Sequence, residues 1–264
     1  MKADLHLHTS ASDGTKCPRD VAKHAFDEGI GLFSVTDHDT VDGLSEAAEA
    51  AAGLGIAFVP GIEISARSNQ EIHILGYNVD YRNPEFCEEV EKVKHLRSNR
   101  NRLIGEKLAA LGVRPDMDFE GEGVGRMNIA RRMVEEGTAR DVQDAFNRYL
   151  GPDGKAYVDA RRVSPLEAVR LIKSFGGLAV LAHPKKYMQN KTLVMLIEGL
   201  KRFGLGGLET RYPTHTPDEV AALEATAARY GLVCTGGSDY HGDEDRRIDY
   251  RPTPATLRAL GVRK

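Results

Sequence analysis

The amino-acid sequence predicts an α/β fold of seven strands in mostly parallel order, interrupted by one helical insertion. Short apolar segments bounded by turn residues alternate with segments of helical periodicity, which is typical of parallel α/β architecture. Between residues 83 and 158 this alternation stops, and charged helical segments replace it. Residues 1–82 and 159–264 are therefore expected to form one strand-rich domain, with residues 83–158 as a helical insertion domain.

The seven strands are predicted from apolar segments that end at turn residues. They cover residues 3–8, 31–36, 57–65, 71–78, 177–182, 206–210 and 232–236. Only residues 67–70 separate the third strand from the fourth, and so short a connection leaves no room for a crossover helix. We therefore expect these two strands to form a hairpin or a sharp bend, and the parallel order to be irregular there.

Helices are predicted between the strands from the residues that begin and end them. The first covers PRDVAKHAFDEG, with Pro18 in the first turn, where proline is tolerated, and Gly29 at the end. Later helices are expected over residues 45–52, 164–175, 192–203 and 216–230. Segments such as NIARRMVEEG and ARDVQDAFNRYLG predict further helices within the insertion.

The composition excludes some classes of protein. The 264 residues include 36 Lys+Arg and 39 Asp+Glu, a net charge of −3, so no general basic surface for long nucleic acids is expected. No apolar segment approaches the roughly 20 residues that span a bilayer, and MKADLHLHTS does not resemble an export signal. Three scattered cysteines, Cys17, Cys87 and Cys234, indicate neither a disulfide framework nor a cysteine zinc site. We expect a cytoplasmic protein that does not bind membranes.

Nine side chains that can bind metal lie at or near the carboxyl ends of the predicted strands. His6 and His8 share one face of the first strand because side chains alternate along a strand. In an α/β barrel the carboxyl ends of the strands form the rim where active sites are built. The nine residues are His6, His8, Asp13, His38, Glu63, His73, His183, Asp239 and His241.

Each of these residues, taken alone, also has an ordinary structural explanation. His73 is compatible with a core histidine bonded to a carbonyl, Asp13 with a turn, and Glu63 with an arginine pair. The convergence of six histidines and three carboxylates at one rim instead favours metal binding. Nine ligands exceed the needs of one ion, and mixed imidazole and carboxylate ligands suit Zn, Mn or Fe. We therefore expect two or three ions.

The motifs that carry these residues resemble those of the polymerase and histidinol phosphatase (PHP) family, in its short bacterial branch of stand-alone phosphoesterases acting on nucleotides. In order they are DLHLHTSASDG, TDHDT, GIEIS, HILGY, AHP and GSDYHG. The resemblance implies a distorted seven-stranded, TIM-like (β/α)7 barrel that holds three divalent ions. It implies one ion at His6, His8, Glu63 and Asp239, a second at Glu63, His73 and His183, and a third at Asp13, His38 and His241.

The charge of such a site predicts the hydrolysis of phosphate monoesters. Three divalent ions and three carboxylates leave about +3, or about +2 with a bridging hydroxide, and this suits a phosphate dianion. Because metal coordination lowers the pKa of water from 15.7 toward about 7, we expect bridging hydroxide to attack phosphorus directly. The expected substrates are small nucleotides, either the 3′-phosphate of a nucleoside 3′,5′-bisphosphate or short oligoribonucleotides.

Residues outside the metal set are expected to act on the substrate. His215 follows the sixth strand, so it is a candidate to protonate the leaving group or bind phosphate, with a structural loop histidine as the alternative. Asp37, beside His38, is expected to orient a metal ligand. Substrate contacts are expected from Arg97, Arg100, Arg126, Arg131, Lys155 and Arg211, with the helical insertion acting as a lid over the substrate.

Three alternative functions stay open at this point. One is histidinol phosphate phosphatase, which requires an acidic contact for the substrate amine. Another is a metal-free binding module, which the complete set of ligand residues disfavours. The third is hydrolysis of amides or lactones, because a metal-activated hydroxide serves both chemistries.

Overall fold

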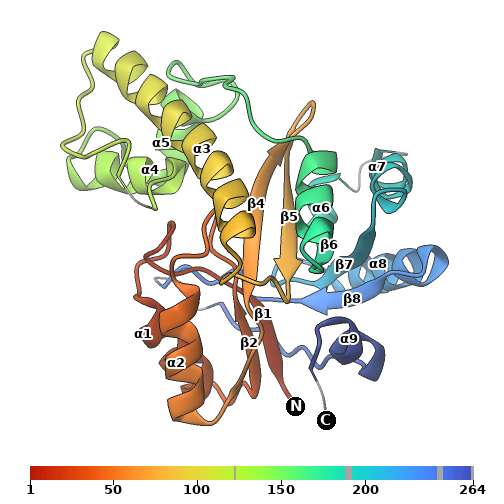
Figure 1. The fold of residues 1–264 in the computed structure, drawn as a ribbon. Helices are drawn as coiled ribbons and strands as arrows, with labels where there is room; N and C mark the ends of the chain where they lie inside the picture. The colour runs from red at the N-terminus through yellow and green to blue at the C-terminus, as the bar shows by residue number, and fades with distance from the viewer. Residues whose placement is uncertain (122, 188–191, 243–245, 263–264) are drawn as a thin grey trace. The chain divides into compact units, whose positions relative to one another are not determined.

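A computed structural model describes residues 1–121, 123–187, 192–242 and 246–262 (Figure 1). The chain divides into two compact units. Unit 1 consists of Met1–Val90 and Val163–Lys264, and unit 2 consists of Glu91–Arg162. None of the helices in the described ranges is both long and apolar enough to cross a bilayer.

Unit 1 is built on two sheets, and the α/β class predicted from the sequence is confirmed. The first sheet has the parallel order β1 (Ala3–Leu7), β2 (Leu32–Val35), β3 (Ala57–Phe58). The second has the order β4 (Gly61–Arg67), β5 (Glu71–Tyr77), β6 (Leu178–Leu181), β7 (Leu205–Arg211), β8 (Val233–Gly236). In this second sheet β5 is antiparallel to both β4 and β6, and the remaining pairs are parallel.

The single strand predicted over residues 57–65 was wrong, because this segment forms two strands. Residues 57–58 pair parallel to β2, whereas the strand from Gly61 pairs antiparallel to β5. Pro60 lies between them and has no backbone N–H to continue a ladder. The described residues therefore form eight strands in two sheets. The predicted hairpin is confirmed, since β4 and β5 are antiparallel neighbours joined by residues 68–70.

Backbone hydrogen bonds link the two sheets at the ends of their strands. The amide of His8, after β1, donates to the carbonyl of Tyr240, after β8, at 2.9 Å. The amide of Asp39, after β2, donates to the carbonyl of Glu63 in β4, also at 2.9 Å. These bonds bring the ends of β1, β2, β4 and β8 together, where the predicted metal ligands lie.

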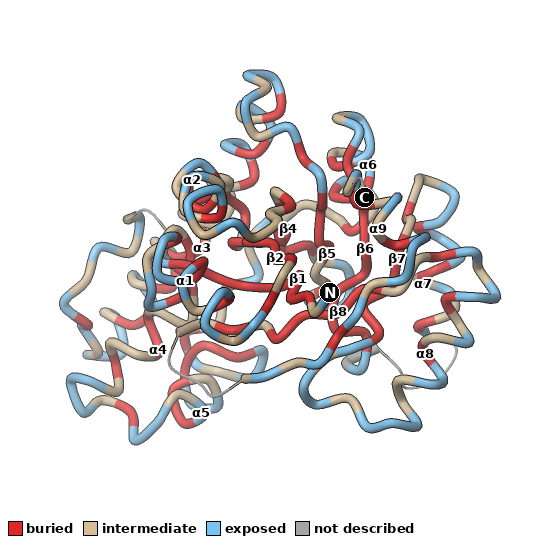
Figure 2. The backbone as a smooth tube through the Cα atoms, turned by 90° about the horizontal axis from the view of Figure 1, so that it is seen from below, coloured by how far each residue is buried: buried red, intermediate tan, exposed pale blue. Residues whose placement is uncertain are grey.

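Five helices of unit 1 lie where turn and capping residues predict them. They are α1 (Pro18–Asp27), α2 (Leu44–Leu54), α6 (Pro165–Ser174), α7 (Thr192–Lys201) and α8 (Pro217–Tyr230). The helix α9 (Pro254–Ala259) and a short 3-10 turn η2 (Pro184–Tyr187) were not predicted. Ser164 and Thr216 each form a capping box with a glutamate three residues later. Burial is concentrated in the strands, and the outer faces of the helices are exposed (Figure 2).

Unit 2 is helical, as the insertion is predicted to be. It contains the larger part of α3 (Pro84–Ala110), together with α4 (Arg126–Glu135), α5 (Val142–Ala145) and a π-helical turn η1 (Phe146–Leu150). It has an apolar core of its own, in which Leu108, Ile129, Met133 and Leu150 are buried. The insertion therefore has the packing expected of a separate folding unit.

Candidate metal centre

The carboxylate of Glu63 lies at the centre of the candidate site, surrounded by five imidazoles. Glu63 belongs to β4 and is 1% exposed. Its Oε2 lies 3.3, 3.2 and 3.2 Å from nitrogens of His6, His8 and His38. Its Oε1 lies 2.9 and 3.2 Å from nitrogens of His73 and His183. The five imidazoles come from four segments of the sequence, and all four meet at the buried carboxylate of Glu63.

The other two predicted carboxylates lie beside the same imidazoles. Oδ1 of Asp239 is 3.4 Å from Nε2 of His6 and 3.2 Å from Nε2 of His8. Oδ1 of Asp13 is 3.2 Å from Nε2 of His241, whose ring stacks on that of His8 at 4.2 Å. All nine predicted ligands are therefore brought together.

Three groups of these residues have ligand atoms close enough to share an ion. In each group the atoms lie within 4.8 Å of one another; the groups are His6, His8, Glu63 and Asp239, then His38, Glu63 and His73, then His8, Asp13, His38 and His241. The first group is the one that the family resemblance implies. In the second, His38 takes the place expected for His183, although Nε2 of His183 lies 3.2 Å from Glu63.

The backbone is strained where two of these side chains leave it. His183 has φ +25° and Asp239 has φ +56°, backbone values that residues other than glycine rarely adopt. Asp39, between His38 and the start of α2, has φ +57°. Such strain persists where the surrounding structure holds it, and it clusters at functional sites. Its position here supports a functional role for the strand ends.

Buried atoms of the centre have the chemistry of metal ligands. Nε2 of His6, Nε2 of His8 and Oε2 of Glu63 are buried and make no hydrogen bond within the described part of the chain. A buried polar atom without a partner is costly, so each such atom requires an explanation. In their deprotonated forms these atoms carry lone pairs, and they converge on one another, which is the arrangement that divalent cations require. The residues present fit such a cluster.

The electrostatics of the metal-free centre lead to the same conclusion. Burial alone would raise the pKa of Glu63, but the imidazoles of His38, His73 and His6 hold that pKa well below its usual range. Burial opposes charge on His8 and His73, yet the carboxylates beside them raise the pKa of His8 to about 10 and that of His73 to about 9. The site thus stabilises positive charge, which protons supply when metal is absent.

Asp37 was expected to orient a metal ligand directly. Its side-chain hydrogen bonds in the described part of the chain instead go to the loop that follows His8. One of its oxygens accepts from the amide of Thr9 at 2.7 Å and from Oγ of Ser12 at 2.5 Å, and the other accepts from Oγ1 of Thr9 at 2.6 Å. Asp37 therefore fixes the loop between His8 and Asp13. It acts on the ligands through the backbone.

Three residues of the site, Glu209, Tyr212 and Arg246, were missed by the sequence analysis. Glu209 on β7 is fully buried and lies 2.9 Å from Nδ1 of His6. Tyr212 donates its hydroxyl hydrogen to Oδ2 of Asp239 at 2.7 Å, and the guanidinium of Arg246 lies 3.2 Å from the same oxygen. The acid in the apolar strand LGGLETR was a usable signal, because a buried carboxylate needs a partner.

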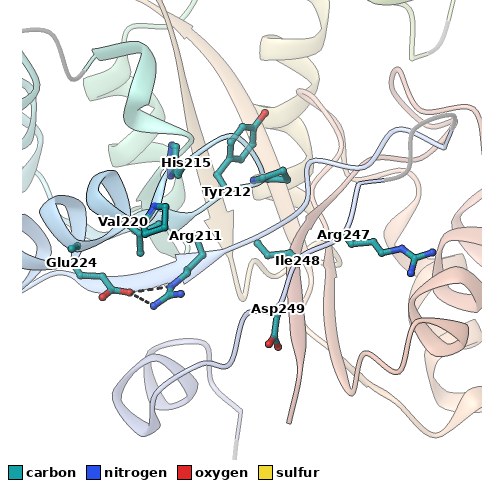
Figure 3. Close-up of a pocket in the computed structure, with 11 residues that line it drawn as sticks. Arg211, Tyr212, His215, Val220, Glu224, Arg247, Ile248 and Asp249 are labelled. Atoms are coloured by element: carbon teal, nitrogen blue, oxygen red, sulfur yellow. Dashed lines mark hydrogen bonds and ion pairs between the residues drawn. The ribbon is translucent and has the colours of Figure 1, made fainter.

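A pocket of about 410 Å³ opens beside the end of β7 (Figure 3). His215, Tyr212, Arg211 and Glu224 are among its lining residues, whereas none of the nine ligand candidates is. Arg211 points toward Glu224 on α8, with its nitrogens 3.1 and 2.9 Å from the carboxylate. Nδ1–H of His215 donates to the carbonyl of Thr210 at 3.0 Å. Arg211 is thus engaged in an ion pair.

The remaining predicted substrate contacts lie in unit 2, and their substrate roles stay predictions. Nε of Arg97 donates to the carbonyl of Val124 at 3.1 Å. Arg100 is buried and donates to Oδ1 of Asn101 at 2.9 Å, and Arg126 lies over the ring of Phe146 at 5.8 Å. Arg131 is half-buried and Lys155 is exposed.

Comparison with known proteins identifies the family. Residues 4–152, more than half of the chain, match the PHP domain. The chain belongs to the PHP family. The resemblance drawn from the sequence motifs is therefore confirmed.

Relatives within this family are phosphatases and phosphoesterases. The chain is 34% identical to the 3′,5′-nucleoside bisphosphate phosphatase of Chromobacterium violaceum, over 90% of this chain and 86% of the relative. It is also 34% identical to the 5′-3′ exoribonuclease Rnm of Escherichia coli, over 90% and 84%. Among solved structures, a putative metal-dependent phosphoesterase from Bifidobacterium adolescentis matches with a TM-score of 0.84 and 28% identity, over 98% of this chain and 94% of that one.

Proposed function

We propose that this PHP protein is a metal-dependent phosphatase that hydrolyses phosphate monoesters of small nucleotides, with the 3′-phosphate of a nucleoside 3′,5′-bisphosphate as the first candidate. The observation that carries the proposal is the buried convergence of five imidazoles on Glu63, with Asp13 and Asp239 beside them. The names of the relatives support the substrate class, since the one acts on nucleoside bisphosphates and the other is an exoribonuclease.

Eight of the nine candidate ligands form the three groups of ligand atoms, and the ninth, His183, lies 3.2 Å from Glu63. Together they would hold three divalent ions, and Mn, Zn or Fe suits this donor set. When bound, such ions supply hydroxide at neutral pH and neutralise the charge of the phosphate. The protein's own contribution is to aim the imidazoles at the ions, which would displace the protons that His8 and His73 carry in the metal-free protein. Glu63 lies between imidazoles from different strands and belongs to two of the three groups, so its carboxylate would hold neighbouring ions close together.

His215 is the candidate proton donor to the leaving alkoxide. A carbonyl only accepts hydrogen bonds, so the contact with Thr210 requires the proton of Nδ1 to stay on that nitrogen. Nε2 is then the atom at which the ring gains and loses a proton. In its protonated form His215 would donate from Nε2, which is the requirement for a general acid.

The finer parts of the sequence prediction belong to this proposal. The hydrogen bonds that join the two sheets support the distorted barrel, with the two-residue β3 as an extension of the first sheet. Contacts between the substrate and the cationic side chains of the insertion, and a location in the cytoplasm, stay predictions.

The proposal is tested by phosphate release in the presence of Mn²⁺. The substrates are a nucleoside 3′,5′-bisphosphate, the 3′- and 5′-monophosphates, a short oligoribonucleotide and histidinol phosphate. We expect kcat/KM for the bisphosphate to exceed that for histidinol phosphate at least about tenfold, and chelated protein to be inactive. A preference for histidinol phosphate would overturn the substrate class. Activity only on the oligoribonucleotide would favour an exoribonuclease.

The proposed single displacement has a test of its own. Direct attack by hydroxide inverts the configuration at phosphorus, whereas a covalent enzyme intermediate retains it. Hydrolysis of a chiral phosphorothioate ester in oxygen-labelled water is expected to give inversion. Retention would overturn direct attack while leaving the metal dependence in place.

A further inference from the structure

We propose that Glu209 is a positioning residue of the metal centre, whose one carboxylate fixes the ring of His6 and the backbone of His183 together. This inference rests on the proposed metal-dependent activity. Glu209 lies on β7, between β6 and β8, and is 0% exposed. Its Oε1 is 2.9 Å from Nδ1 of His6, and its Oε2 accepts from the amide of His183 at 2.6 Å.

The contact with His6 selects one tautomer of the imidazole. A carboxylate only accepts hydrogen bonds, so Nδ1 of His6 must carry the hydrogen that lies between it and Glu209. The lone pair of the neutral ring is then on Nε2. That atom lies 3.3 Å from Oε2 of Glu63 and 3.4 Å from Oδ1 of Asp239, inside the first group of ligand atoms. Glu209 therefore presents the nitrogen lone pair that a metal ion needs.

The contact with His183 holds a strained segment of backbone. His183 follows β6 with φ +25°, and its amide has the carboxylate of Glu209 as its acceptor. With the backbone held in this way, Nε2 of His183 reaches a point 3.2 Å from Oε1 of Glu63. A charge-assisted bond of this length is one of the stronger restraints that a side chain can apply.

The two contacts together link two histidines that face different oxygens of Glu63. His6 faces Oε2 of Glu63, whereas His183 faces Oε1. Glu209 bonds to Nδ1 of His6 and to the amide of His183, whereas Nε2 of each ring faces Glu63. It therefore sets the position of one histidine relative to the other. By contrast, Asp37 accepts from an amide and from hydroxyls of the loop after His8, and Asp39 accepts from the amide of Ser65 in β4. Glu209 differs from Asp37 because it bonds directly to the ring of a candidate ligand.

The substitution Glu209→Gln preserves the shape of the side chain but not its two acceptors. If the amide oxygen accepts from His183, the NH₂ group faces Nδ1 of His6 and favours the tautomer with the hydrogen on Nε2, which removes the ligand lone pair. If the oxygen instead accepts from His6, the NH₂ group opposes the N–H of His183. Either orientation disturbs a ligand. Glu209→Asp keeps both acceptor oxygens but shortens the reach, so it is expected to recover part of the loss.

The test compares metal binding in four full-length proteins: wild type, Glu209→Gln, Glu209→Asp and Thr235→Val. Thr235 is the buried register partner of Glu209 on β8, so its substitution controls for disturbance of the sheet. Mn²⁺ affinity is measured by competition with a chelator, and the ligand field by the visible spectrum of the Co²⁺ form. We expect Glu209→Gln to lose about 10- to 100-fold in affinity with an altered Co²⁺ spectrum.

The other variants make the result interpretable. We expect Glu209→Asp to bind Mn²⁺ more tightly than Glu209→Gln. We expect Thr235→Val to stay within about twofold of wild type, because Thr235 belongs to no group of ligand atoms. Wild-type affinity and spectrum in Glu209→Gln would overturn the proposal, as would an equal loss in Thr235→Val. If Glu209→Gln does not fold, the Asp variant decides, because an unchanged Co²⁺ spectrum there would overturn it. A wild-type protein that binds metal but hydrolyses no phosphate ester would refute the proposed function and leave this comparison valid.

Discussion

The strand ends of unit 1 and the helices of unit 2 carry charge in opposite ways. In unit 1, nine polar groups from distant parts of the sequence, Glu63 among them, lie together and are buried or half-buried. In unit 2, charged side chains pair with neighbours one helical turn away, as in Arg102 with Glu106 and Arg132 with Glu135. Those partners are 36% to 64% exposed.

The physical difference lies in the cost of leaving a charge unpaired. Exposed ion pairs contribute about 0–1 kcal/mol, because water solvates the partners almost as well. A buried charge without a partner costs several times more, so buried acids persist only where something compensates them. A cluster of buried acids and imidazoles is therefore informative about chemistry. A helix rich in charge is informative mainly about its surface.

The largest effect is expected from Glu63→Gln. The central carboxylate would lose its charge and one of its two acceptor oxygens, while five imidazoles still face it. We expect phosphatase activity to fall at least about 10³-fold, with loss of bound metal measured by elemental analysis. Glu106→Gln, the same substitution in an exposed pair of unit 2, is the matched control and is expected to stay near wild-type activity. Equal losses in both variants would remove the contrast between the units.

Proton release on metal binding is expected to be the next largest effect. In the metal-free protein the pKa of His8 is about 10 and that of His73 about 9, so both rings are protonated at neutral pH. Because metal ligation requires neutral imidazole, at least two protons leave, and affinity rises up to about 100-fold per pH unit below pH 9. Calorimetry in buffers of different ionisation enthalpy measures the stoichiometry. Binding without proton release would contradict these pKa directions.

The same shifts affect the stability of the metal-free protein. The pKa of each ring is raised in the folded state, so each stabilises the fold fully below its ordinary value of 6.5. That stabilisation is lost as the pH rises through about 9 for His73 and about 10 for His8. Metal binding removes this dependence because the rings are then neutral. A Tm that falls at alkaline pH only in the metal-free form is the expected result.

A smaller effect is expected from Tyr212→Phe. The substitution removes the 2.7 Å hydrogen bond to Oδ2 of Asp239, but Arg246 stays 3.2 Å from the same oxygen. Asp239 thus keeps one of two restraints. We expect kcat to fall about tenfold, close to the lower end of the losses seen when support of a ligand is removed. An unchanged kcat with raised KM would instead assign Tyr212 to substrate binding.

The sequence predicted well which candidate ligands lie together, because their positions follow from topology. A histidine or acid at the end of a parallel strand must lie at the common edge, so His6, His38 and Asp239 could be placed there without coordinates. The division of the ligands into three groups could not be predicted. Side-chain packing, rather than topology, places His38 instead of His183 in the group with Glu63 and His73. The break at Pro60 was visible in the sequence but was read as the interior of one strand.

Residues that hydrogen-bond to the candidate ligands were harder to predict. Glu209 and Tyr212 lie on one strand and the segment after it, and neither belongs to a motif with metal-ligand spacing. The role of Glu209 depends on a contact with His6, 203 residues away in the sequence. The role of Tyr212 depends on a contact with Asp239, 27 residues away. Asp37 was identified, but its true partners, Thr9 and Ser12, could not be inferred from its place beside His38.

The smallest expected effects concern two buried acids, one from each unit, whose pKa values are shifted in opposite directions. Burial raises the pKa of Asp4 to about 6, whereas the amide of Arg140 lowers the pKa of Asp144. In the metal-free protein, Asp4→Asn is expected to be stabilising above pH 6 by on the order of 1–3 kcal/mol, and neutral below pH 4. The oxygen of Asn can still accept from the amides of His6 and Ser238.

Asp144→Asn is expected to have the opposite sign. Because the pKa of Asp144 is lowered in the folded state, its carboxylate stabilises the fold above its ordinary value of 3.8, and this contribution fades as the pH falls. The variant should therefore be less stable than wild type at neutral pH and approach it in acid. Thermal unfolding of both variants between pH 4 and pH 8 measures the two slopes. If both variants shifted in the same direction, one of the two pKa directions would be wrong, and the local partners of each acid would not be what separates Asp4 from Asp144.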